Sequence, residues 1–244
     1  MSLLSEFGVR DFQYKAQRPK VVSKYAQACL EALANNALGR YLSLGGAFGL
    51  AHYFEYRVTH DVDAWWIEPI TSEEREQVIR ILVETLQLYG EVRTRTWGDV
   101  VSIELIQDGS TVFSFQIAVR SAQLQNLIPI PWLTGLWLDS FDDLVASKMN
   151  ALIERGAPRD FRDIYMLCQA EFCSIKQCWE LWRERQLLTK EKADFERARL
   201  AIHTHLERIE RARPLEQIAD PQQRLSAEQV RKWFFDRFTY DMHN

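Results

Sequence analysis

The chain has 244 residues and a formal net charge of −4, and 47% of its residues are hydrophobic. This length can bury a core in one large or two small domains, and the composition is ordinary for a soluble globular protein. The longest apolar run, residues 127–138, is too short for a membrane span and contains two prolines, and no N-terminal stretch has the pattern of a signal peptide. We therefore expect a cytoplasmic protein without a membrane partner.

The first half of the chain mixes helical and strand patterns. Val22, Tyr25, Cys29 and Leu33 have helical spacing, and Thr71 with Glu74 forms a capping box. After a polar arm over residues 1–20, we expect helices over 21–37, 47–56 and 71–90, and strands over 41–44, 61–67, 91–96, 100–107 and 111–119.

The second half is helical to its end. A proline-containing connection over 127–138 precedes helices expected over 140–155, from Pro158 onward, over 174–187 and over 190–213, and Ser226 with Gln229 is expected to cap the last helix. The fold class predicted is α+β. A domain over 21–139 has a small mixed sheet flanked by helices, and a helical domain over 140–244 follows.

Charge and cysteine content indicate little by themselves. Residues 1–145 hold 12 basic and 18 acidic residues, whereas residues 146–244 hold 18 and 16, so the second half is mildly basic. A polyanionic partner is one interpretation and an ordinary solvated surface is the other.

The last three of the four cysteines, Cys168, Cys173 and Cys178, are five residues apart and would not share a helix face, so we expect free thiols and no zinc.

Two acids in an apolar strand carry the first chemical signal. Asp61 and Asp63 in "DVDAWWI" are two residues apart, so their side chains lie on one face of the strand. At this separation two carboxylates repel by roughly 2–3 kcal/mol at an effective dielectric constant near 20. A divalent cation such as Mg²⁺ would offset this repulsion. The alternative is that Asp61 ends the strand and Asp63 pairs with an arginine such as Arg57.

A glycine pair precedes this strand. Gly45 and Gly46 follow the apolar run "YLSL" and lead into a helix. Such a pair allows a phosphate to approach backbone N–H groups at the start of a helix, although a simple tight turn has the same pattern.

Both signals occur in this order in a known family. The segments "LGGAFGLAHYFEYRVTHDVD" (44–63) and "SFDDLVASKMNALIERGAPRDFRDIYML" (140–167) make the chain resemble the nucleotidyltransferase superfamily and, more narrowly, the AbiEii/AbiGii-type toxins. The resemblance covers about residues 41–167. It implies a small mixed sheet flanked by helices, followed by a helical domain.

The resemblance also implies a role for each matching residue. Gly45 and Gly46 would hold the phosphates of an NTP, Asp61 and Asp63 would bind Mg²⁺, and Lys148 would lie against the triphosphate. Arg159, Asp160 and Asp163 fill the R-D-x-x-D positions, where with Arg57 they would orient Lys148 or the nucleotide. Members of this superfamily generally have a third carboxylate on a neighbouring strand. Glu104 is one candidate for it, but Gln116 on the next strand could occupy the position instead.

The same residues can also be interpreted from helix geometry alone, independently of the resemblance. Lys148 lies within the apolar stripe of its helix, so its ammonium is expected to reach an anion, either a phosphate or the Asp61/Asp63 pair, unless it extends to water. Arg159 and Asp163 are four residues apart and could pair with each other. Asp160 would then only favour the helix start.

The resemblance implies a Mg²⁺-dependent nucleotidyltransferase that moves a nucleoside monophosphate from an NTP to a hydroxyl of an RNA (a tRNA end, for example) or of a protein. Asp63 or Glu104 would serve as the base. The setting implied is a bacterial toxin–antitoxin or phage-defence system with a cognate antitoxin. The rival hypotheses are a nucleotide-binding module without turnover, which Gln116 favours, and a fold used only for protein interaction.

Overall fold

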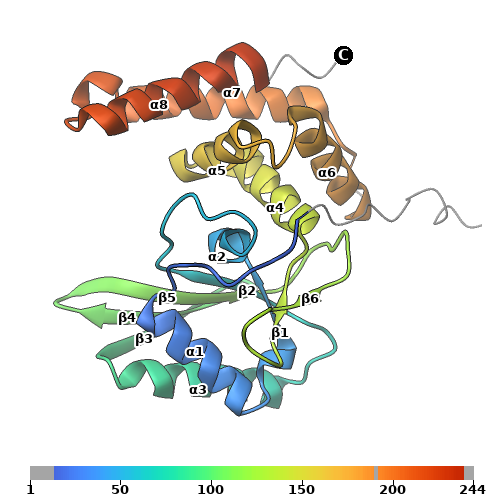
Figure 1. The fold of residues 1–244 in the computed structure, drawn as a ribbon, viewed down its shortest axis with the longest axis vertical. Coiled ribbons are helices and arrows are strands. Elements are labelled where there is room, and N and C mark those ends of the chain that lie inside the picture. The colour runs from blue at the N-terminus through green and yellow to red at the C-terminus, as the bar shows by residue number, and fades with distance from the viewer. Residues whose placement is uncertain (1–13, 190–191, 239–244) are drawn as a thin grey trace, which may run out of the picture.

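The computed structural model describes residues 14–189 and 192–238. A mixed seven-stranded sheet, in the order β3-β4-β5-β2-β1-β7-β6, forms the middle of the molecule. Helices α1 and α3 cover one face of the sheet, and α2 lies on the other face, between the sheet and helices α4 to α8 (Figure 1). The predicted α+β class and the following helical region are confirmed.

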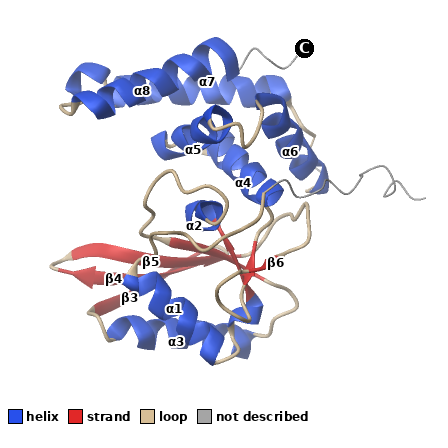
Figure 2. Cartoon of the chain, in the orientation of Figure 1, coloured by secondary structure: helices blue, strands red, loops and turns tan. Residues whose placement is uncertain are grey.

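Figure 2 shows that all strands lie in one part of the molecule, together with α1 to α3, whereas the other part is built of helices alone. The first part consists of α1 (Lys24–Asn35), β1 (Leu42–Gly45), α2 (Gly46–Ala51), β2 (Val62–Trp66), α3 (Ser72–Gln87), β3 (Glu91–Trp97), β4 (Val100–Gln107), β5 (Ser110–Ala118), β6 (Ile128–Pro129) and β7 (Trp137–Leu138). The second part consists of α4 (Phe141–Glu154), α5 (Pro158–Gln169), α6 (Ile175–Leu188), α7 (Phe195–Ala212) and α8 (Pro221–Trp233), with a π-helical turn over Phe234–Phe238. Within the described parts of the chain, no helix is long and apolar enough to cross a membrane.

The hydrophobic core has two clusters, one on each side of α2. The first lies between the sheet and α1 and α3 and includes Leu33, Leu82 and Phe115, all fully buried. The second joins α4 to α8 and includes Leu50 of α2. Because α2 contacts both β2 and α4, it fixes how the helical part sits on the sheet.

Three local expectations differ from the structure. Ser226 lies inside α8, which begins earlier because Asp220 accepts the capping hydrogen bond from the Gln223 N–H. The connection over 127–138 contributes two short edge strands, which its prolines concealed. The predicted arm ends sooner than residue 20, since Tyr14 stacks on Phe172 and Gln17 hydrogen-bonds the His52 carbonyl; residues 1–13 lie outside the described residues.

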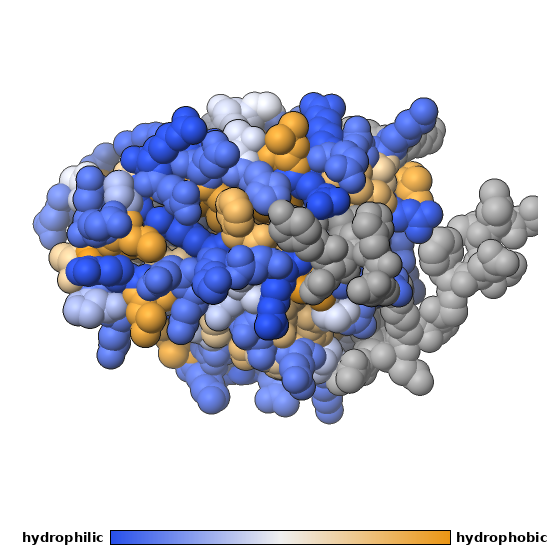
Figure 3. Space-filling view, turned by 90° about the horizontal axis from the view of Figure 1, so that it is seen from above, coloured by the Kyte–Doolittle hydropathy of each residue, from blue (hydrophilic) through white to orange (hydrophobic). Residues whose placement is uncertain are grey.

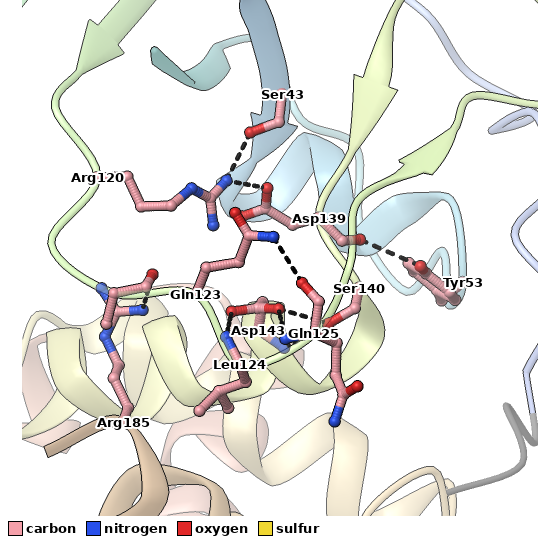
Figure 4. A network of polar contacts seen from close by, with 11 residues as sticks. Ser43, Tyr53, Arg120, Gln123, Leu124, Gln125, Asp139, Ser140, Asp143 and Arg185 are labelled. Atoms are coloured by element: carbon pink, nitrogen blue, oxygen red, sulfur yellow. Dashed lines mark hydrogen bonds and ion pairs between the residues drawn. The ribbon is translucent and has the colours of Figure 1, made fainter. Parts of the chain in front are cut away.

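Buried polar contacts join the two parts at the segment after β5 (Figure 4). Arg120 pairs with Asp139 and donates to the Ser43 hydroxyl over 2.5 Å. Asp143 of α4 accepts the backbone N–H groups of Leu124 and Gln125, and Arg185 of α6 donates to the Ala122 carbonyl and the Ser121 hydroxyl. Buried carboxylates are tolerated only when paired in this way, so the network fixes the junction between sheet and helices.

His52, which ends α2, is buried and neutral. Its Nε2 accepts from the Trp132 indole N–H over 3.1 Å, so the proton must lie on Nδ1, which is 3.0 Å from the Phe48 carbonyl. Burial lowers the pKa of His52 to about 4, against 6.5 for the free side chain.

The free energy of unfolding is therefore expected to decrease as the pH is lowered below 6.5. Between pH 6.5 and 4 the unfolded chain protonates this imidazole and the folded chain does not, so acid favours unfolding. At pH 5 this contribution is about 2 kcal/mol. His52→Gln removes the titration while keeping an acceptor for Trp132. Urea unfolding at pH 7.5 and pH 5 should show a smaller acid-induced loss in the variant by that amount, and an equal loss in both proteins would contradict this assignment.

Candidate functional site

The two predicted acids lie together at the start of β2. Asp61 immediately precedes the strand and accepts hydrogen bonds from the backbone N–H (3.2 Å) and hydroxyl (2.9 Å) of Ser114 on β5. Asp63 pairs in register with Gly45 on one side and Gln116 on the other. Neither acid is bound to an arginine by a hydrogen bond or ion pair within the described residues, so the alternative of an Arg57–Asp63 pair is wrong.

The glycine pair packs directly against this strand. Gly46 has φ +57°, and a Cβ placed on it would lie 1.9 Å from Asp63 Oδ2. A Cβ on Gly45 would lie 2.3 Å from Trp65 Nε1, a buried N–H without a partner. The turn therefore requires glycine twice, and its backbone lies against the Asp63 carboxylate.

Lys148 reaches this region from α4. It is only 7% exposed, and its Nζ lies 2.6 Å from Oδ2 of Asp163, which is fully buried. Arg57 also binds Asp163, with Nε 3.0 Å from Oδ1, and the Tyr56 hydroxyl donates to the same oxygen. Lys148 does reach an anion, but its partner is Asp163 of α5 and not the predicted Asp61/Asp63 pair.

The residues of the R-D-x-x-D segment have other partners than the predicted Arg159–Asp163 pair. Asp160 is also fully buried; it accepts two hydrogen bonds from Arg155 and one from the Ala157 N–H at the start of α5. Arg159 is exposed and is not ion-paired with either acid. The expected pair is wrong because both acids point into the protein, where Arg57, Lys148 and Arg155 meet them.

The charges around Asp63 oppose one another. Burial raises the pKa of Asp63, Lys148 counteracts this, and the nearby Asp61 raises it further. Arg159 and Arg155 also favour the ionised form. For Asp163, burial is outweighed by Lys148 and Arg57, so its pKa lies below the usual value. The sheet supplies the acids of this site, and α4 and α5 supply cations.

The position next to Asp63 is occupied by an amide. Gln116 is the neighbour of Asp63 on β5, and Glu104 is opposite Ser114 on β4. Glu104 shares the face of the acid pair, but it is two strand spacings, about 10 Å, from β2 and binds Arg93 over 2.6 Å. Its role as a third metal ligand stays a prediction that this geometry does not favour.

The acid pair suits a Mg²⁺ ion in its chemistry. Among residues 14–189 and 192–238, no three His, Cys, Asp or Glu side chains are arranged to hold a metal. Two carboxylates on one face are nevertheless the ligand set of Mg²⁺ sites that complete their shell with water and phosphate oxygens. The chemistry of the acid pair therefore fits a Mg²⁺ ion.

The cysteines lie closer together than expected. Cys178 Sγ is 3.8 Å from Cys168 Sγ and 3.4 Å from Cys173 Sγ, because the three come from the end of α5, the following turn and α6 rather than from one helix. All are free thiols, as predicted.

Sequence reasoning missed three contributors to the site. Arg155, the residue that caps the C-terminal end of α4, lies two turns after Lys148 on the same side, a spacing that could have revealed it. Ser114, two residues before Gln116 on β5, and Tyr56, next to Arg57, have no pattern of their own. Their roles depend on the pairing of distant segments.

Comparisons with known proteins agree with the motifs. The family model described as "Nucleotidyl transferase AbiEii toxin, Type IV TA system" matches residues 28–238. Among solved structures, JHP933 from Helicobacter pylori is 14% identical with a TM-score of 0.43, covering 88% of this chain and 95% of its own. Another, described as "putative nucleotidyltransferase from H. pylori", is 15% identical with a TM-score of 0.45, covering 87% and 94%. No curated protein matches.

The Gly46 contact predicts a specific destabilisation. Gly98 also has a positive φ, of 52°, but a Cβ there meets nothing within 4 Å. Gly98→Ala should cost about 1 kcal/mol of backbone strain. Gly46→Ala should cost about 2–4 kcal/mol, because it adds a clash with Asp63 to that strain. Urea unfolding of both variants tests this, and equal losses would show that Asp63 does not pack against the turn.

Proposed function

Because the chain belongs to the AbiEii nucleotidyltransferase toxin family of type IV toxin–antitoxin systems, we propose that it transfers a nucleoside monophosphate from an NTP to a hydroxyl acceptor, with Mg²⁺ bound by Asp61 and Asp63. One observation carries the proposal: two acids on one face of β2 lie against a double glycine turn, and Lys148 is held beside them by Asp163. A cognate antitoxin follows from the family assignment.

Each residue has a defined task in this reaction. Gly45 and Gly46 admit the phosphates, and Lys148, with Arg155 and Arg159 nearby, balances their charge. Bound Mg²⁺ would neutralise charge on the phosphate oxygens. The acceptor oxygen attacks the α-phosphorus, the bond to the β-phosphate oxygen breaks, and pyrophosphate leaves. Asp63 is the better placed base for the hydroxyl proton, because Glu104 is paired with Arg93.

The rival function is nucleotide binding without transfer. It is favoured by Gln116, which places a neutral amide where a third carboxylate would increase the negative charge. Labelled NTPs incubated with Mg²⁺ and either total RNA or total protein separate the two functions. Label in a macromolecule supports transfer; nucleotide binding with no labelled acceptor supports the rival. If neither NTP nor Mg²⁺ raises the melting temperature, the result supports the third hypothesis, a fold used only for protein interaction.

The acids should contribute unequally to transfer. Asp63→Asn should lower kcat about a thousandfold or more, because a metal ligand and the base are lost together. Glu104→Gln should lower it only a few-fold, since that side chain is two strands away. Initial rates with saturating NTP and Mg²⁺ measure both. A comparable loss in the two variants would restore Glu104 as the third ligand.

The two buried acids of α5 should be separable by their kinetics. Asp163→Asn should lower the free energy of unfolding by about 3 kcal/mol, because it leaves the buried Lys148 without a partner. Asp160→Asn should cost less, because its partner Arg155 is half exposed and can be solvated. Asp163 holds Lys148, so Asp163→Asn should also raise KM for the NTP, and by more than Asp160→Asn, which releases only the half-exposed Arg155. Steady-state kinetics at a temperature where both variants are folded provide the test. An equal KM change in both would mean that Asp163 only stabilises the fold.

A further inference from the structure

Three of the four cysteines meet at one point that the proposed reaction does not use. The Sγ atom of Cys178 lies 3.4 Å from that of Cys173 and 3.8 Å from that of Cys168, and all three are free thiols. We refer to these three residues as the thiol cluster. The sulfur atoms of a disulfide are about 2.05 Å apart, so even the longer pair would have to close by only about 1.8 Å.

Local packing accounts for two of the three thiols. Cys173 comes directly before Ser174, the residue that caps the start of α6, and Cys178 lies in the second turn of that helix. These are the two positions of a hydrophobic staple, at which apolar side chains pack against each other, and a cysteine can serve there as a small apolar residue. Cys168 belongs to α5 and is not part of the staple. Its sulfur therefore adds a third thiol that the packing of α6 does not require.

The three thiols differ in their access to solvent. Figure 3 shows that the face over α7 and α8 is mostly hydrophilic, with apolar side chains in small separate groups, so the helical part keeps its large apolar cluster inside. Cys178 is fully buried in that cluster and Cys173 is 3% exposed, whereas Cys168 is only partly buried and packs against it. A small polar reagent in solution therefore reaches the thiol cluster at Cys168.

The central thiol is poorly suited to react first. Hydrogen bonds with Cys168 and Cys173, together with burial, raise the pKa of Cys178 well above its usual value. Because a thiolate is the form of cysteine that attacks an oxidant, Cys178 stays protonated and unreactive until a neighbouring sulfur has been oxidised. An accessible thiol beside a buried one that can resolve it is the arrangement found at reversible cysteine oxidation sites.

We propose that the thiol cluster is an oxidation site for hydrogen peroxide, at which Cys168 and Cys178 form a disulfide. The Cys168 thiolate attacks one peroxide oxygen, the O–O bond breaks, and the departing hydroxide takes up the proton that the thiol released, which gives a sulfenic acid and one water. The Cys178 sulfur then attacks the sulfur of Cys168, the S–O bond breaks, and the oxygen leaves with the Cys178 proton as a second water. Two thiols lose two electrons in total, and one peroxide is reduced to two waters.

The disulfide would act on the turn between α5 and α6. That turn carries Phe172, whose ring stacks on Phe54 of the loop before β2 with centroids 4.5 Å apart. The same loop supplies Arg57 to the buried Asp163. Oxidation would thus fix the turn that supports the loop leading into the acids of β2. The inference itself does not depend on the proposed transfer reaction.

Peptide mapping without reduction tests the disulfide. The full chain is treated with hydrogen peroxide, unfolded with iodoacetamide to block the remaining thiols, and digested. Trypsin cleaves after Lys176 and separates Cys178 from the other two cysteines, and chymotrypsin cleaves after Phe172 and separates Cys168 from Cys173. We expect a peptide pair joined through Cys168 and Cys178.

Two variants and an internal control make the test specific. Cys168→Ser should slow disulfide formation about tenfold or more, because only buried thiols remain in the cluster. Cys178→Ala should instead accumulate a sulfenic acid on Cys168, which dimedone traps. Cys29, a fully buried thiol of the other apolar cluster whose pKa burial raises to about 12, should be recovered as its iodoacetamide adduct throughout. Circular dichroism confirms that each variant is folded, and Cys168→Ser alters a residue outside the staple.

Three results would overturn the inference. The first is that peroxide leaves the three thiols as free as Cys29. The second is that Cys168 is converted to sulfinic or sulfonic acid without any disulfide to Cys178. The third is that a bond between Cys173 and Cys178 forms equally fast in the wild type and in Cys168→Ser. Failure of the labelled-NTP experiment would leave the oxidation site unaffected, so the two proposals can fail separately.

Discussion

The buried carboxylate of Asp163 is the interaction on which the arrangement of this molecule depends. It receives Arg57 and Tyr56 from the loop before β2 and Lys148 from α4, and it belongs to α5. Removing Asp163 would leave the buried ammonium of Lys148 without a partner, and loss of a buried charge partner typically destabilises a protein by about 3–5 kcal/mol. The loop that leads into the acid pair and the helix that carries the lysine are therefore held together, although about a hundred residues separate them.

Most of the helices and strands could be predicted from local patterns in the sequence. The capping box of Thr71 and Glu74, the hairpin signal between β4 and β5 and the helical spacing of the second half all correspond to observed elements. The errors arose where a local pattern had a competitor. Ser226 has a cap-like pattern, but Asp220 followed by proline begins the helix a turn and a half earlier. Strands β6 and β7 form because β1 offers a free edge, which no local window of sequence can show.

For the site, the sequence indicated candidate residues but not which of them meet. The i, i+2 spacing indicated that Asp61 and Asp63 belong together, and the helical stripe indicated that Lys148 needs an anion. The sequence alone could not identify that anion as Asp163. The four-residue spacing favours an Arg159–Asp163 pair, and only the packing of α5 against α4 turns Asp163 inward. The choice between Glu104 and Gln116 depended on register, and one pairing, Asp63 with Gln116, decides which of them is the neighbour.

The division of charge between the two parts explains why the site requires both. Asp61 and Asp63 come from the sheet, whereas Lys148, Arg155 and Arg159 come from α4 and α5. A nucleoside triphosphate with its Mg²⁺ has the complementary division, a dication that prefers the acids and phosphates that prefer the cations. Because Gln116 is neutral, the two aspartates would balance one dication in the proposed complex, and the phosphates would have to supply any further negative charge.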